Sequence, residues 1–175
     1  IAVSVMNSIL GGGIFSGRLM QNLREDKAYT YGARSQLSSD QLIGNFSASA
    51  SVRNEVTDSS ITEFLYEMRK MVTDGVTADD LQLAKNSLAG GFARSLESPQ
   101  TIARFARNTY KYNLPKDYYN TYLSKLEAVS QADFEAMAKK YIRPENANII
   151  VVGSKDDVAD KLNQFDADGK LDYYD

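Results

Sequence analysis

The chain has 175 residues, of which 43% are hydrophobic and 25% charged, a composition with enough apolar material for one folded domain. Its net charge of −3 argues against a nucleic-acid binder, and no apolar run is long enough to span a membrane. Cysteine and histidine are both absent, which excludes disulfides, a Ser-His-Asp hydrolase and an ordinary zinc site built from this chain alone.

Two helices are predicted at the start of the chain. Residues 1–10 are apolar with small side chains, and Gly11 to Gly13 suit the end of a helix, where a left-handed residue is favoured. Residues 14–26 predict a second short helix, because apolar residues such as Leu19 and Leu23 recur there at a spacing of four.

An antiparallel β-hairpin is predicted next. Its strands are residues 28–37 and 42–52, and the second of them alternates regularly between polar and apolar or small side chains. Ser38-Ser39-Asp40 supplies turn-forming residues between the two strands.

The middle of the chain predicts a run of helices. From Thr57 the apolar period becomes helical, and Gly75 ends that helix. Further helices begin after residues that suit an N-cap: Thr77, Ser98 and Ser130. Tyrosines near residues 110–122 resemble a ligand-stacking cluster, but their helical spacing favours packing between helices.

The C-terminal part predicts a buried strand, a helix and an edge strand. The strand is the β-branched run 147–152, the helix carries Val158 and Leu162, and Asp168-Gly169 turns into an edge strand at 170–174. The whole order predicts an α+β fold in which helices pack on one face of a mainly antiparallel sheet.

Two short motifs are weighed and set aside. Gly12 and Gly17 have the spacing of a phosphate-binding loop, but Arg18-Leu19 stand where lysine and Ser/Thr are required. Residues 166–171 match half of a calcium loop, but the usual first aspartate and twelfth glutamate are missing, so an acidic turn is favoured.

Arg24 and Tyr31 form the most distinctive polar pair. The predicted change from helix to strand between them brings two long side chains to the end of the sheet. Arginine can bind a peptide carbonyl or carboxylate, and a tyrosine hydroxyl can donate to a developing oxyanion. On spacing alone, a surface arginine beside a strand tyrosine is the favoured interpretation of the pair.

Three stretches, Ile9 to Gly13, Ser16 to Leu19 and Leu23 to Gly32, resemble the C-terminal, non-zinc domain of the insulinase/pitrilysin family of inverted zincin metalloproteases. The resemblance covers nearly the whole chain. It departs from the family pattern at Gly17, where serine is common, and at Ala28, where glycine is frequent.

The resemblance implies half of a protease site. A homologous domain or subunit would carry zinc on H-x-x-E-H, so this chain would bind no metal and would not be catalytic alone. Arg24 would hold the substrate backbone and Tyr31 would donate to the oxyanion of a peptide substrate. Gly11, Gly12 and Gly13 correspond to a segment implicated in substrate handling, although a packing role explains these glycines at least as well.

Several alternatives stay open at this stage. Residues 1–175 would be one C-terminal domain of a zinc-dependent metalloendopeptidase, excised from a longer protein without its first strand. A structural or assembly subunit derived from the same proteases, and a stand-alone peptide-binding module, are the rival functions. The compartment is not determined, although the absence of cysteine is compatible with an exported bacterial protein.

Overall fold

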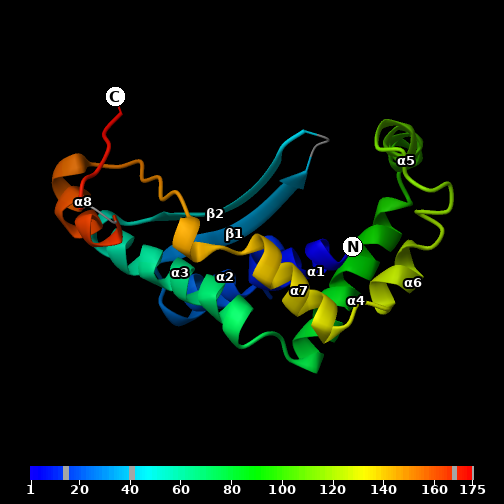
Figure 1. The fold of residues 1–175 in the computed structure, drawn as a ribbon, viewed down its shortest axis with the longest axis horizontal. Coiled ribbons are helices and arrows are strands. Elements are labelled where there is room, and N and C mark those ends of the chain that lie inside the picture. Colours follow the sequence, from blue (N-terminus) through cyan, green and yellow to red (C-terminus); the bar gives the residue numbers. More distant parts are fainter. Residues whose placement is uncertain (14–15, 40–41, 167–168, 175) are drawn as a thin grey trace.

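The computed structural model describes residues 1–13, 16–39, 42–166 and 169–174. It has an α+β fold, as predicted, in which helices cover one face of a long β-hairpin (Figure 1). The sheet within these residues is two-stranded and antiparallel.

The hairpin consists of β1 (Thr30–Ser39) and β2 (Gly44–Val52). Small and apolar side chains such as Ala33, opposite Ala50, face the helices, while the polar residues between them face outward. The predicted hairpin is therefore confirmed. Ser38 and Ser39 extend β1 rather than forming the turn, and Asp40 lies outside the described residues.

The first helical layer alternates between α-helical and π-helical segments. These are α1 (Ala2–Asn7), the π-helical η1 (Ser8–Gly12), α2 (Arg18–Met20) and the π-helical η2 (Gln21–Asp26). The layer contributes several fully buried side chains to the core: Val5, Met6, Leu10, Leu19 and Leu23. Burial of these side chains explains why the segments are stable although each is short.

A helical pair follows the hairpin through the 3-10 turn η3 (Asn54–Val56). It consists of α3 (Thr57–Thr73) and α4 (Ala78–Ser95). Gly75 between them has φ +69°, which confirms that it ends the first helix. Arg18 donates from Nη2 to the Gly75 carbonyl at 2.7 Å and so ties α2 to this turn.

Three further helices are α5 (Pro99–Lys111), α6 (Tyr122–Glu127) and α7 (Gln131–Tyr141). Ser130 begins α7 with a reciprocal capping box. Its hydroxyl accepts from the Asp133 N–H at 3.1 Å, and the Asp133 carboxylate accepts from the Ser130 N–H at 2.9 Å. The Ser130 N–H and the Ser130 hydroxyl, which also donates to Asp133 Oδ2 at 2.7 Å, hold the pKa of the Asp133 carboxyl below its usual value.

The C-terminal part contains the 3-10 turn η4 (Pro144–Asn146), α8 (Lys155–Leu162) and the 3-10 turn η5 (Asn163–Phe165). The prediction of a buried strand at 147–152 is wrong in this structure. The run is irregular, and Ile150 and Val152 are 85% and 96% exposed. Residues 170–174 are irregular too, so the predicted edge strand is also wrong, and Asp168 lies outside the described residues.

Both errors have one physical cause. A strand is stable only when a neighbouring strand pairs with its backbone groups, and β1 and β2 pair with each other alone among the described residues. The side-chain pattern therefore predicted strands for which the described residues supply no pairing partner.

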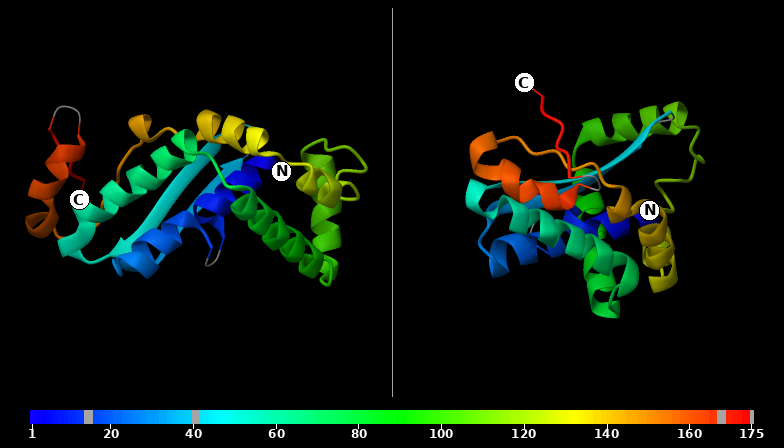
Figure 2. Two further views of the ribbon diagram at one scale, coloured as in Figure 1. Left: turned by 90° about the horizontal axis from the view of Figure 1, so that it is seen from below. Right: turned by 60° about the vertical axis from the view of Figure 1, so that its left-hand side comes forward.

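The molecule is elongated, with α5 at one end and α8 at the other (Figure 2). At the α5 end, rings from three helices and the connections between them stack on one another. The ring centroids of Phe105 and Tyr119 are 3.7 Å apart, and those of Phe92 and Tyr122 are 4.5 Å apart. Packing is thus confirmed for Tyr119 and Tyr122, whereas Tyr110 is 92% exposed.

Candidate functional site

The glycine run lies where helix and hairpin meet at van der Waals distance. A Cβ atom on Gly11 would lie 2.6 Å from the Ser35 backbone nitrogen and 2.9 Å from Leu19 Cδ1. A Cβ atom on Gly17 would lie 3.0 Å from the Gly11 Cα. Glycine is therefore required so that η1, β1 and the start of α2 can approach one another.

This close contact, and not a left-handed residue at the end of a helix, explains the glycine run. The positive-φ glycines of the described residues are Gly75 and Gly169, and Gly13 is extended at φ −79° and ψ 144°. The run does end a helix, because η1 stops at Gly12, but without a left-handed residue. Gly11 is buried beneath β1 and Gly12 is exposed.

A polar pair beside Gly11 fastens the same junction. Asn7 donates from Nδ2 to the Ser35 carbonyl at 3.3 Å, and the Ser35 hydroxyl donates to Asn7 Oδ1 at 2.9 Å. One signal of this pair is present in the sequence, a single asparagine in a helical segment whose other residues are apolar or small. The bonds fix the position of β1 against α1.

Arg24 lies in η2, near the point where the chain leaves the helix. Its Nη1 lies 3.5 Å from the neighbouring Glu25 carboxylate, and its side chain is 37% exposed. The segment ends at Asp26, and the chain then turns at Ala28, whose φ of +51° is left-handed. The Tyr29 N–H donates back to the Leu23 carbonyl at 2.8 Å. Glycine adopts this conformation more easily than alanine, which explains why glycine suits this position.

Tyr31 lies at a β-bulge near the start of β1. Thr30 is opposite Val52 and Ala33 is opposite Ala50, so two residues of β1 face one residue of β2. The Thr30 hydroxyl accepts from the Gly32 N–H at 3.1 Å and donates to the Ser51 carbonyl at 2.7 Å. These bonds hold the bulge in place, and the Tyr31 side chain is 98% exposed.

The structure thus places the predicted helix-to-strand change between Arg24 and Tyr31. Both side chains reach solvent, and β1 contacts both η1 and η2. Gly11 packs against β1 at Ser35, four residues from Tyr31, which is roughly 13 Å along a strand. The glycine run therefore contacts β1 at a point separate from Tyr31.

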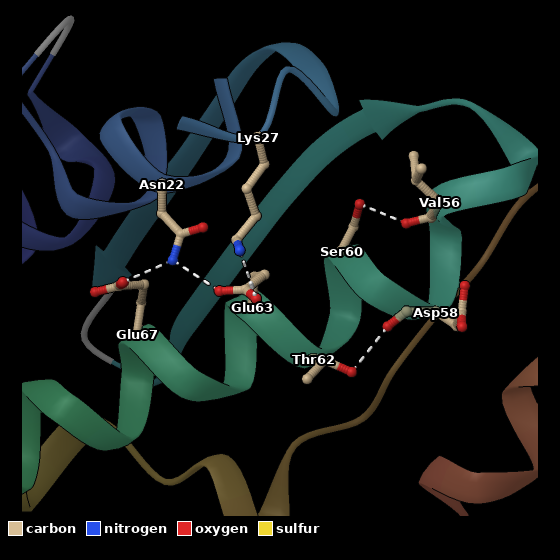
Figure 3. A network of polar contacts seen from close by, with 8 residues as sticks. All are labelled: Asn22, Lys27, Val56, Asp58, Ser60, Thr62, Glu63 and Glu67. Atoms are coloured by element: carbon tan, nitrogen blue, oxygen red, sulfur yellow. Dashed lines mark hydrogen bonds and ion pairs between the residues drawn. The ribbon is translucent and has the colours of Figure 1, made fainter. Parts of the chain in front are cut away.

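A network missed by the sequence analysis anchors η2 to α3 (Figure 3). Asn22 donates from Nδ2 to Glu63 Oε2 and to Glu67 Oε1, both at 2.8 Å. Lys27 Nζ lies 3.2 Å from Glu63 Oε1, and this contact raises the pKa of the lysine above its usual value. The sequence contained one hint, because Glu67 falls among the apolar positions of α3.

The parts of the chain that the structure describes hold no metal-ligand cluster and no membrane-spanning helix. No group of three or more histidine, cysteine, aspartate or glutamate residues there could hold a metal ion. Among the same residues, no helix is both long and apolar enough to cross a bilayer.

Comparison with protein families gives a direct match. The family model described as the peptidase M16 inactive domain matches residues 1–88. An uncharacterized zinc protease of Mycobacterium tuberculosis H37Rv is 30% identical over 139 residues, which is 79% of this chain and 31% of that protein. A zinc protease of Bacillus subtilis 168 is 31% identical over 107 residues, covering 59% of this chain and 25% of that protein.

Solved structures agree with the sequence relatives. A peptidase M16 inactive domain from Pseudomonas fluorescens has a TM-score of 0.76 and 29% identity, over 82% of this chain and 34% of that chain. A protease from Helicobacter pylori has a TM-score of 0.70 at 19% identity, over 82% and 34% of the two chains, and supports the fold. The chain spans about a third of the length of these relatives.

Proposed function

Because the chain belongs to the peptidase M16 family, as its C-terminal inactive domain, we propose that it holds the substrate of a zinc-dependent endopeptidase. A homologous domain or subunit would carry the metal. The observation that carries the proposal is the exposed tyrosine at the bulge of β1, seven residues after an accessible arginine. The relatives named as zinc proteases are about two and a half times as long as this chain, which leaves room for a metal-bearing half.

The proposed roles follow from the chemistry of the two side chains. The Arg24 guanidinium presents a fork of donors that suits a peptide carbonyl or carboxylate. The Tyr31 hydroxyl, free of the core, can donate to the oxygen that becomes negative when water adds to the scissile carbonyl. The zinc of the other half would polarise that carbonyl and activate the water.

The glycine run has a narrower proposed role. Gly12 is exposed and could lie against an extended peptide, whereas Gly11 is buried and Gly13 is partly buried. We therefore assign substrate contact within Gly11 to Gly13 chiefly to the Gly12 backbone, and assign Gly11 to packing.

The test uses the full-length protein, or this chain combined with its zinc-bearing half. Tyr31→Phe is expected to lower kcat for an unfolded peptide by at least about tenfold with little change in KM, because the lost hydrogen bond strengthens in the transition state. Tyr110→Phe is the matched control, since it removes an equally exposed hydroxyl from α5 and should leave kcat unchanged. Cleavage would be followed with a quenched fluorogenic peptide.

Two outcomes would contradict the proposal. Equal turnover by the wild type and Tyr31→Phe would remove the oxyanion role from Tyr31. A complete assembly that cleaves no peptide, with a partner that lacks a zinc motif, would indicate the rival structural or assembly function.

We also propose that residues 1–175 are part of a domain that begins upstream of Ile1. The exposed β-branched run 147–152 would then pair with a strand from the preceding segment. Hydrogen exchange checks this directly, because the amides of Ile149 to Val152 should be protected in the longer protein and exchange freely in the 175-residue chain. Equally fast exchange in both would disprove the pairing.

A further inference from the structure

The side-chain amide nitrogen of Asn22 joins η2 to α3. Its side chain is buried with 8% of the residue exposed, and both Nδ2 hydrogens are used, one for Glu63 and one for Glu67. Figure 3 shows the amide pointing from η2 directly between the two carboxylates. Since these glutamates are four residues apart on one face of α3, a single amide can bridge them.

Polar contacts with α3, one from Asn22 in η2 and one from Lys27 directly after it, lie on either side of Arg24. Asn22 precedes the arginine by two residues and Lys27 follows it by three, and both contact Glu63. Residues two apart in a helix point in different directions, so an Asn22 side chain directed into the protein leaves Arg24 directed away from α3. The exposure of the two residues agrees with this arrangement.

The π-helical form of η2 makes such anchors important. A π-helix is rarely stable by itself, so contacts with the rest of the protein decide its position. The two carboxylates orient the Asn22 amide so that its Nδ2 faces them. Its Oδ1 is then buried without a hydrogen-bond partner among the described residues, which is energetically unfavourable.

From this arrangement we infer that Asn22, bridged to Glu63 and Glu67, is a positioning residue that fixes η2 so that Arg24 faces the substrate. The inference rests on the proposed role of Arg24. Without the amide, the two carboxylates lose their shared donor and repel each other across the gap left in the contact. The η2 segment would then move away from α3 and carry the arginine with it.

The experiment compares variants of the full-length enzyme. Asn22→Leu should raise KM about as much as Arg24→Ala, by about tenfold, while kcat changes less. In the Arg24→Ala background, Asn22→Leu should raise KM no further, because both changes remove the same interaction. Glu67→Gln should keep KM within about twofold of the wild type, since its amide oxygen still accepts from Asn22.

A second measurement does not depend on activity. The amides of Lys27, Ala28 and Tyr29 donate to carbonyl groups of η2, at Asn22, Arg24 and Leu23 respectively. Their hydrogen exchange should become faster in Asn22→Leu but not in Glu67→Gln. Gln82→Leu, which alters an exposed polar contact on α4, is the control that should change neither exchange nor KM.

The outcomes separate this inference from the proposed function. An unchanged exchange rate in Asn22→Leu, or a KM increase that adds fully to that of Arg24→Ala, would overturn the positioning role. A normal KM in Arg24→Ala together with faster exchange in Asn22→Leu would instead remove the substrate-binding role of the arginine and leave Asn22 as the anchor of η2.

Discussion

Replacing Gly11 with alanine is expected to destabilise the chain by about 3 kcal/mol, the upper end of the usual cost of overpacking. The added methyl group would lie 2.6 Å from the Ser35 backbone nitrogen and 2.9 Å from Leu19 Cδ1. Because one of these neighbours is backbone in β1, the strand itself would have to move. Movement of β1 would also strain the bonds between Asn7 and Ser35. Urea unfolding of the two proteins would give the difference in free energy.

Gly90→Ala is the matched control for this prediction. It makes the same substitution inside α4, where an added Cβ would have no atom within 4 Å. Alanine should stabilise that helix by about 0.5–1 kcal/mol, because glycine loses more backbone freedom on folding. A Gly11→Ala protein as stable as the wild type would show that the junction between η1 and β1 can open without cost.

Asn22→Asp is expected to destabilise the chain by about 3–5 kcal/mol at neutral pH, the cost of leaving a buried charge without compensation. The substitution keeps the size of the side chain but replaces a donor shared by two carboxylates with a third carboxylate. The nearest cation of the network, Lys27, is already paired with Glu63. Thermal or urea unfolding would measure the effect.

The pH dependence of the same variant has a defined sign. Burial beside Glu63 and Glu67 should raise the pKa of the introduced carboxyl in the folded state above its value in the unfolded chain. The folded state then binds more protons than the unfolded state between these two pKa values, so the deficit relative to the wild type should shrink as the pH falls. The exposed Asn86→Asp should stay within about 0.5 kcal/mol of the wild type at each pH. A deficit in Asn22→Asp that is equal at pH 5 and pH 7 would contradict the three-carboxylate explanation.

Local patterns predicted those elements whose cause is local. The β-hairpin follows from alternation of side chains, the end of α3 from Gly75, and the start of α7 from Ser130. Each of these signals acts within a few residues, so the sequence contains the whole explanation. The placement of Arg24 near a helix end and of Tyr31 in a strand was likewise predicted from local pattern.

The remaining features depend on contacts between distant segments. The strand expected at 147–152 requires a pairing partner, which no side-chain pattern can supply. Asn22 acts as an anchor only through its contacts with Glu63 and Glu67, which are more than forty residues away in the sequence. For the glycine run, the expected left-handed residue is wrong and the packing alternative is supported. A glycine needed for close approach and one needed for left-handed backbone look the same in a sequence.

The bulge in β1 also determines which way the candidate tyrosine faces. Counting back from the inward Ala33 in a regular strand, position 31 would face the helices and position 30 would face solvent. The structure has the reverse, with Thr30 buried and Tyr31 exposed, because the inserted residue shifts the alternation by one. The outward orientation of the phenol is therefore a property of strand phase: with Ala33 facing inward, regular pairing of residues 31 and 32 without the bulge would direct the same tyrosine toward the helices.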